Sequence, residues 1–213
     1  MSLPLEACLV YDVWLVSDNA KTRNELLREA PDVSLVARAQ TGDLTAFEEL
    51  VRRYRNDVFR LSYHYLRNRE EAWDLSQEVF IKVYRSVGSF RGESNFKTWV
   101  LRIATNQCKD YFKKRRLATV SFDDRIGLEA PGRQLEPGHA VAAQEIGEAI
   151  QAALDKLPHK HRTAFVLREF EGLSYEEMSK VMQCSLGTVM SRLHHARKKL
   201  QQSLIHMGIA EES

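Results

Sequence analysis

Residues 172–200, GLSYEEMSKVMQCSLGTVMSRLHHARKKL, contain two helical patterns separated by a short break. Ser174 is placed to cap the first helix, and Glu177 three residues later completes the pattern of a capping box. The apolar spacing breaks at Gln183, and Ser185 can cap the second helix. Basic side chains crowd the polar side of that second helix. This arrangement predicts a helix-turn-helix whose second helix enters the major groove of DNA.

The charge of the chain is unevenly distributed. The net charge is only +2, but residues 32–117 hold 17 Lys and Arg against 11 Asp and Glu. Such a local excess of basic side chains favours a polyanionic partner for this part of the surface.

The cysteine content and the apolar runs indicate a cellular compartment. Cys8, Cys108 and Cys184 are isolated from one another, which favours a reducing environment and argues against a zinc site. No apolar run reaches the roughly 18 residues of a membrane helix. The first charged residue is Glu6, whereas a secretory signal begins with basic residues. We therefore expect a cytoplasmic protein without membrane insertion, metal or cofactor.

The remaining chain from Asp32 onward has helical periodicity. Apolar residues recur every three or four positions from Leu35 to Tyr111, with breaks at 41–43 and in the loop 88–95. Four helices in about 85 residues suffice for a small hydrophobic core.

A segment rich in glycine and proline, residues 118–140, follows these helices. With little apolar periodicity and a mildly acidic composition, it predicts a flexible linker. The expected fold is all-α, with two small helical domains joined by this linker. The expected divisions are an N-terminal extension of unknown role (1–31), a first domain (32–117), the linker (118–140), a second domain with the helix-turn-helix (141–205) and a tail (206–213).

Five stretches in a fixed order connect the chain to a known family. They are AFEELVRRY (46–54), DLSQEVFIKVYR (74–85), SFRGESNFKTWVLRIATNQCKDYFKKRR (89–116), LPHKHRTAFVLREFEGLSYEEMSKVM (157–182) and SLGTVMSRLHHARKKL (185–200). Together they resemble the extracytoplasmic-function group of bacterial sigma factors, of the sigma-E/sigma-W type, in the sigma-70 family. The resemblance covers roughly residues 33–203. It implies a first domain (sigma region 2) that binds polymerase and opens the −10 element, and a second (sigma region 4) that recognises the −35 element.

The resemblance also implies the partners. They are core RNA polymerase, through its β′ clamp coiled coil and its β flap, promoter DNA, and an anti-sigma factor. The expected role is that of a sigma factor in transcription initiation, without enzymatic activity.

The candidate polymerase-binding residues are Asp74, Gln77 and Glu78. One helical turn separates Asp74 from Glu78, so the three share a polar face opposite Val79 and Val83. Such a face can hydrogen-bond basic residues of a partner helix, which the resemblance identifies as the β′ clamp coiled coil. The alternative is an ordinary solvated face.

The candidate −10 residues lie in the loop 88–95 and on the following helix. Short polar groups on a loop can bond the edges of an unpaired base, and the resemblance implies this role here. Further along, basic and amide side chains can follow the phosphates. The set is Arg91, Glu93, Ser94, Asn95, Lys97, Asn106, Lys109 and Lys113. Trp99 shares an apolar stripe with Ile103, so we assign it to the core rather than to base stacking.

The candidate −35 residues lie on the second helix of the helix-turn-helix, and Val189 on that helix is assigned to the core. They are Ser185, Thr188, Met190, Ser191, Arg192, His194, His195 and Lys199. Relatives commonly have Lys or Arg where Met190 stands and often Arg where His195 stands. Met190 cannot donate to guanine as arginine does, so the family preference for a −35 sequence transfers poorly.

Two other classes of protein share parts of this pattern. A response-regulator-type activator also carries a helix-turn-helix, but it needs an upstream βα domain, and residues 32–117 show only helical patterns. A metal-dependent nucleic-acid enzyme would need the acidic pairs and histidines to converge, yet they lie in separate segments without metal-ligand spacing.

Overall fold

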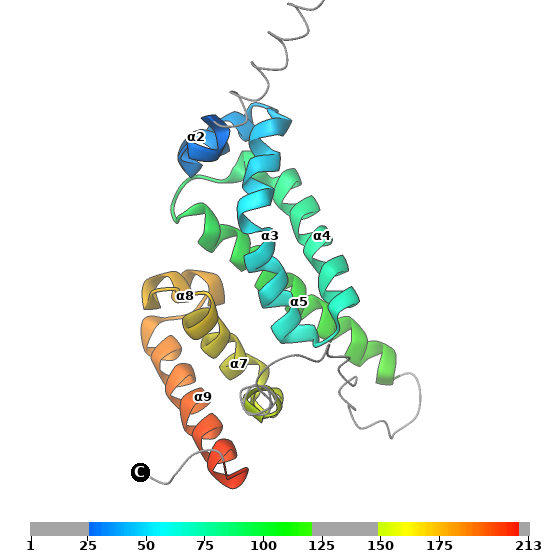
Figure 1. Ribbon diagram of the computed structural model, residues 1–213, viewed down its shortest axis with the longest axis vertical. Coiled ribbons are helices and arrows are strands. Elements are labelled where there is room, and N and C mark those ends of the chain that lie inside the picture. Colours follow the sequence, from blue (N-terminus) through cyan, green and yellow to red (C-terminus); the bar gives the residue numbers. More distant parts are fainter. Residues whose placement is uncertain (1–25, 121–148, 209–213) are drawn as a thin grey trace, which may run out of the picture.

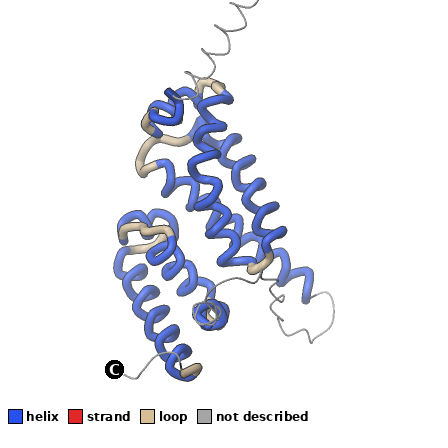
Figure 2. Tube along the Cα trace, viewed as in Figure 1, coloured by secondary structure: helices blue, strands red, loops and turns tan. Residues whose placement is uncertain are grey.

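The computed structural model describes residues 26–120 and 149–208, without the side chains of 116–120. Throughout these ranges the regular structure is helical, and no strand occurs in them (Figures 1 and 2). The predicted all-α fold class is confirmed.

The described N-terminal part, residues 26–120, is a bundle built around α3. Its elements are α2 (Asp32–Gln40), α3 (Leu44–Leu66), α4 (Arg69–Ser86), the 3₁₀ turn η1 (Val87–Ser89) and α5 (Phe96–Val120). Helix α3 packs against α2, α4 and α5. It begins where predicted because the Asp43 carboxylate accepts hydrogen bonds from the backbone N–H groups of Thr45 (3.0 Å) and Ala46 (3.2 Å).

The C-terminal part, residues 149–208, contains the predicted helix-turn-helix. After a helical segment at 149–155 come α7 (His159–Phe165), the π-helical turn η2 (Val166–Phe170), α8 (Tyr175–Met182) and α9 (Leu186–His206). The capping box at the start of α8 is confirmed, with both Ser174 and Glu177 in their expected roles. Gln183 ends α8 in the left-handed region at φ 51°, where the break in apolar spacing was predicted.

The two parts share one hydrophobic core. Val100 and Leu101 of α5 belong to the same buried cluster as Met178 and Val181 of α8. The Tyr65 hydroxyl of α3 is hydrogen-bonded to the Thr163 hydroxyl of α7. In this structure the two parts therefore pack as one body.

Two sequence-based core assignments are confirmed. Trp99 is 7% exposed and packs its ring at 5.1 Å from Phe90 and 5.6 Å from Phe96, so it belongs to the core. Val189 is fully buried on α9. Both follow from apolar spacing on a helix.

The ends of the N-terminal part differ from the predicted divisions. Leu27 is buried, and Arg53 donates hydrogen bonds to the carbonyls of Leu27, Arg28 and Ala30. Part of the segment assigned to the extension thus packs on α3. Helix α5 continues to Val120, three residues past 117. The predicted linker lies almost entirely outside the described residues, and the domain divisions remain predictions.

Candidate nucleic-acid interface

The first candidate surface lies on α4. Asp74, Gln77 and Glu78 are all exposed, while Val79 and Val83 on the opposite side are fully buried. The exposed apolar side chains Trp73, Ile81 and Tyr84 lie on the same helix. Polar groups interspersed with exposed aromatic and aliphatic ones are typical of a protein-docking surface. The sequence predicted the polar members of this surface but not the apolar ones.

The 90–95 loop, between η1 and α5, forms a hollow of about 210 Å³. Its lining combines aromatic walls with polar and basic groups: Ser89, Phe90, Arg91, Glu93, Ser94, Thr98, Trp99, Arg102 and Lys180. Three of the predicted −10 residues, Arg91, Glu93 and Ser94, therefore meet at one place. A hollow with aromatic walls and polar donors can accept a planar base.

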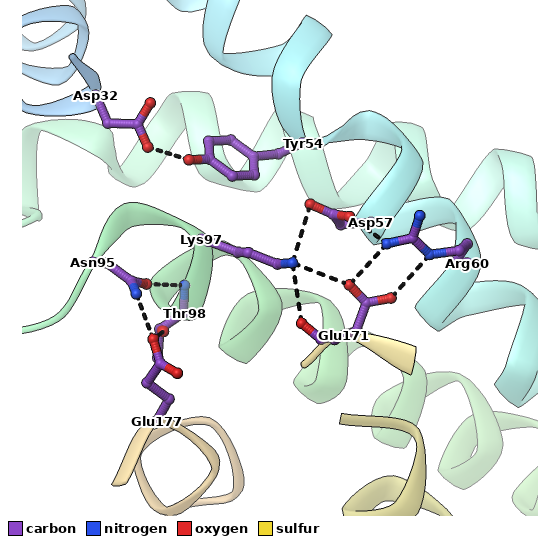
Figure 3. Close-up of polar contacts among 9 residues, drawn as sticks. All are labelled: Asp32, Tyr54, Asp57, Arg60, Asn95, Lys97, Thr98, Glu171 and Glu177. Carbon is purple, nitrogen blue, oxygen red and sulfur yellow. Dashed lines mark hydrogen bonds and ion pairs between the residues drawn. The ribbon is translucent and has the colours of Figure 1, made fainter. Parts of the chain in front are cut away.

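Asn95 has two structural contacts that the sequence did not predict. Its side-chain oxygen accepts a hydrogen bond from the Thr98 backbone N–H at 2.7 Å, which caps α5. Its amide nitrogen donates to the Glu177 carboxylate of α8 at 2.5 Å (Figure 3). Asn95 thus uses both ends of its side-chain amide in this arrangement.

A polar stripe continues along α5 from the loop. Arg102, Asn106, Lys109 and Lys113 follow one another at steps of three and four residues, so they share one face of the helix. Lys109 donates weakly to Asn106 at 3.4 Å. Burial lowers the pKa of Lys109, and the charge of Arg192 on α9 lowers it further. Arg102 was not predicted, although its spacing from Asn106 on a helix could have indicated it.

The N-terminus of α9 uses two of the candidate −35 residues for capping. The Ser185 hydroxyl accepts from the Thr188 backbone N–H at 3.3 Å and is also hydrogen-bonded to the Thr188 hydroxyl at 2.9 Å. These hydroxyls hold the helix start, and Ser185 is exposed while Thr188 is partly exposed.

The remaining candidates on α9 divide by exposure. Met190, Ser191, His194, His195 and Lys199 are exposed. Arg192 is partly buried and donates to the Cys184 sulfur at 3.5 Å. The His195 ring stacks on His161 of α7, with centroids 5.7 Å apart and an angle of 22°. Side chains at the exposed positions can reach base edges and phosphates without rearrangement of the helix-turn-helix.

The contacts between the two parts form a junction rich in charged side chains of both signs. Glu171, whose side chain is fully buried, pairs with Arg60 at 3.2 Å and with Lys97 at 3.5 Å (Figure 3). Lys97 also lies 3.5 Å from Asp57. Burial raises the pKa of Glu171, although Arg60 and Lys97 oppose this effect.

Further contacts at this junction come from α8. The Lys180 ammonium donates to the Glu93 carbonyl at 2.6 Å. The backbone N–H of Ser174 holds the pKa of Glu177 below its usual value, and Asn95 contributes in the same direction. The sequence does not predict these partners, because nothing in the spacing of Glu177 and Lys180 connects them to a loop some 80 residues away.

The groups that an enzyme would need do not converge among the described residues. Asp74 and Glu78 lie on α4, Asp110 on α5, and His194 and His195 on α9. In ranges 26–120 and 149–208 no three His, Cys, Asp or Glu side chains form a possible metal site. Within the same ranges no helix combines the length and apolar character that crossing a membrane requires.

Comparison with known families matches both parts of the chain. Residues 50–118 match the family described as Sigma-70 region 2, and residues 147–200 match Sigma-70, region 4. The RNA polymerase sigma-H factor of Pseudomonas aeruginosa is 39% identical, over 84% of this chain and 96% of its own length. The ECF RNA polymerase sigma-E factor of Escherichia coli K12 is 38% identical, over 81% of this chain and 94% of its own length.

Solved structures share the fold. The sigma factor RpoE of Bartonella quintana, crystallised with the anti-sigma factor NepR, superposes with a TM-score of 0.64 at 24% identity. The match covers 75% of this chain and 96% of that one. CnrH, solved with the cytosolic domain of CnrY, has a TM-score of 0.63 at 24% identity, covering 82% of this chain and 97% of that one.

Proposed function

This chain belongs to the extracytoplasmic-function group of the sigma-70 family. We propose that three of its exposed polar surfaces have separate roles in transcription initiation. These surfaces lie on α4, on the 90–95 loop with α5, and on α9. The protein is a sigma factor that directs core RNA polymerase to specific promoters and opens the −10 element. Its action on polymerase supports a location in the cytoplasm and a regulatory role rather than a catalytic one.

The α4 surface is proposed to bind the β′ clamp coiled coil of core polymerase. Asp74, Gln77 and Glu78 are exposed acceptors, and Trp73 and Ile81 supply apolar area beside them. Charge-assisted bonds to a basic helix would fix the register, while apolar burial would supply affinity.

The loop and α5 are proposed to hold the −10 element. The hollow lined by Arg91, Ser94 and Trp99 has room for one extruded base. Asn95 and Lys97 follow the loop, at the place where the two parts of the chain are in contact. Along α5, Asn106, Lys109 and Lys113 would follow the phosphates of the strand.

Helix α9 is proposed to recognise the −35 element. The observation that carries this assignment is the difference in exposure between the two faces of α9. Val189, Leu193 and Ala196 are buried, while the candidate side chains on the polar face are exposed or partly exposed. Ser191 and His195 are the best placed for base edges, and Lys199 for phosphate. The β flap of polymerase and an anti-sigma factor complete the proposed partners.

The test is run-off transcription by core polymerase reconstituted with the purified chain, on genomic fragments that the holoenzyme itself selects. Discrete transcripts that core polymerase alone does not make are the expected result. Metal-dependent cleavage of the DNA, or transcripts identical to those of core polymerase alone, would contradict the proposal.

A further inference from the structure

A second hollow, of about 310 Å³, lies between α5 and α7. Lys109 and Phe112 line it from α5, and His159 and Arg162 line it from α7. Its volume is at the lower end of the roughly 300–1,000 Å³ that small-molecule sites occupy. The polar groups of the lining are an ammonium, a guanidinium and an imidazole, beside one aromatic ring. The hollow therefore combines positive charge with an aromatic wall.

The cations around this hollow outnumber the carboxylates that pair with them. Within ranges 26–120 and 149–208 the Lys109 ammonium forms no ion pair. Arg162 shares the carboxylate of Asp155 with Arg67, each at 3.5 Å. Burial lowers the pKa of Lys109, and the charge of Arg192 lowers it further. An anion bound in the hollow would relieve this repulsion among like charges.

Two groups of the lining retain unused hydrogen-bonding capacity. Arg162 donates from Nε to the Leu154 carbonyl at 2.9 Å and from Nη2 to the Asp155 carbonyl at 2.6 Å. A guanidinium has more N–H donors than these contacts use. The Nε2 atom of His159 is buried and has no hydrogen-bond partner among the described residues. Such unused polar groups favour a ligand that carries hydrogen-bonding atoms.

The lining also indicates the chemical class of the ligand. A lysine beside an arginine suits a phosphate group, which carries up to two negative charges and several acceptor oxygens. Phe112 is partly exposed and meets the His159 ring edge to face, with centroids 5.8 Å apart. An aromatic wall of this kind favours a planar ring in the ligand, as in a nucleobase.

We propose that the hollow between α5 and α7 is a binding site for a small phosphorylated ligand with a planar ring, of the nucleoside monophosphate class. Lys109 and Arg162 pair with the phosphoryl oxygens, and Phe112 contacts the base. Because the lining comes from both parts of the chain, the site is complete only while they are in contact. A bound ligand therefore stabilises that contact by mass action.

The test is isothermal titration calorimetry of the full chain with adenosine 5′-monophosphate (AMP), at neutral pH and constant ionic strength. AMP should bind, and adenosine and inorganic phosphate should each bind about tenfold more weakly, because each lacks one half of the ligand. Lys109→Gln should weaken AMP binding about tenfold, since it removes a charged donor to the phosphate. The matched control is Lys114→Gln. It removes the same charge from an exposed side chain of α5 that does not line the hollow, so its AMP affinity should equal that of the wild type.

Phe112→Leu is a second variant that separates the ring contact from the charges. It should weaken AMP binding about tenfold and leave phosphate binding, measured at higher ligand concentration, as in the wild type. A purely structural disturbance of the hollow would weaken both.

Three results would overturn the proposal: no AMP binding by the wild type, equal AMP affinity of Lys109→Gln and Lys114→Gln, or phosphate binding as tight as that of AMP. Neither polymerase nor promoter DNA takes part in these titrations. Their outcome is therefore independent of the run-off transcription that tests the proposed function.

Discussion

Lowering the pH should open the junction, because two histidines are partly buried there among cations. His64 of α3 stacks on Phe170 of η2 at 4.2 Å and has Arg67, Arg60 and Arg162 as charged neighbours. His159 of α7 packs on Tyr65 at 4.7 Å and faces Lys109 and Arg162. Protonating either ring would place another positive charge in a desolvated, already cationic environment.

The sign and size of the effect follow from the pKa values. Burial, assisted by the neighbouring cations, lowers the pKa of His64 and of His159 from 6.5 to about 4. Because both pKa values are lowered, the stabilising contribution of the neutral histidines to the packed state is fully present above pH 6.5. It is lost as the pH falls toward 4. At pH 5 the loss is about 2 kcal/mol per histidine, or about 4 kcal/mol for both. Glu171 acts in the opposite sense, because burial raises its pKa and protonation favours its buried form.

The assay is small-angle X-ray scattering of the full chain at pH 7.5, 6 and 5, at constant ionic strength. The radius of gyration should increase toward pH 5 as the two parts separate. The control is His64→Phe combined with His159→Phe, which keeps the aromatic contacts and removes both titrating groups. Equal expansion of the wild type and this variant at pH 5 would refute the reasoning, since the histidines would then have no part in it.

The proposed binding surfaces lead to three further predictions. Asp74→Lys with Glu78→Lys should abolish co-purification with core polymerase while leaving the circular-dichroism melting curve unchanged, because both side chains are exposed; normal holoenzyme assembly would contradict the α4 assignment. Ser94→Ala should reduce strand opening, measured by permanganate footprinting, more than initial promoter binding, because Ser94 lines the loop hollow. His195→Ala should relax discrimination at one or two base pairs by about 1–3 kcal/mol each, whereas Lys199→Ala should weaken binding to all sequences and flatten the salt dependence; binding isotherms on a −35 library at two salt concentrations distinguish these outcomes, and an equal uniform loss would contradict the division.

The sequence alone was sufficient for the local structure. The capping box of Ser174 and Glu177, the helix break at 41–43 and the break at Gln183 depend on residues within three or four positions of one another. Helix periodicity likewise assigned Trp99 and Val189 to the core. Such features follow from backbone geometry and from the spacing of apolar side chains, which a single sequence displays directly.

The candidate site was predicted only in part. The exposure of Asp74, Gln77 and Glu78 followed from their position opposite buried valines. The second role of Asn95, which caps α5 and bonds Glu177, was missed. The hollow that Arg102 and Lys180 share was also missed, because those residues come from segments far apart in the chain.

Only the tertiary structure decided how the two helical parts meet. Arg60 and Glu171 are 111 positions apart, and Tyr65 and Thr163 are 98 apart, yet each pair is in contact. In the sequence Glu171 looks like an ordinary surface carboxylate and Glu177 only like the acidic member of a capping box, and helical spacing gives no information about partners on another helix. Whether such a side chain meets water or a remote cation depends on the packing of the shared core, which depends on all of the buried residues at once. The sequence therefore determined the helices and their exposed faces, and the assembled core determined that the proposed −10 loop faces the chain's own acidic residues.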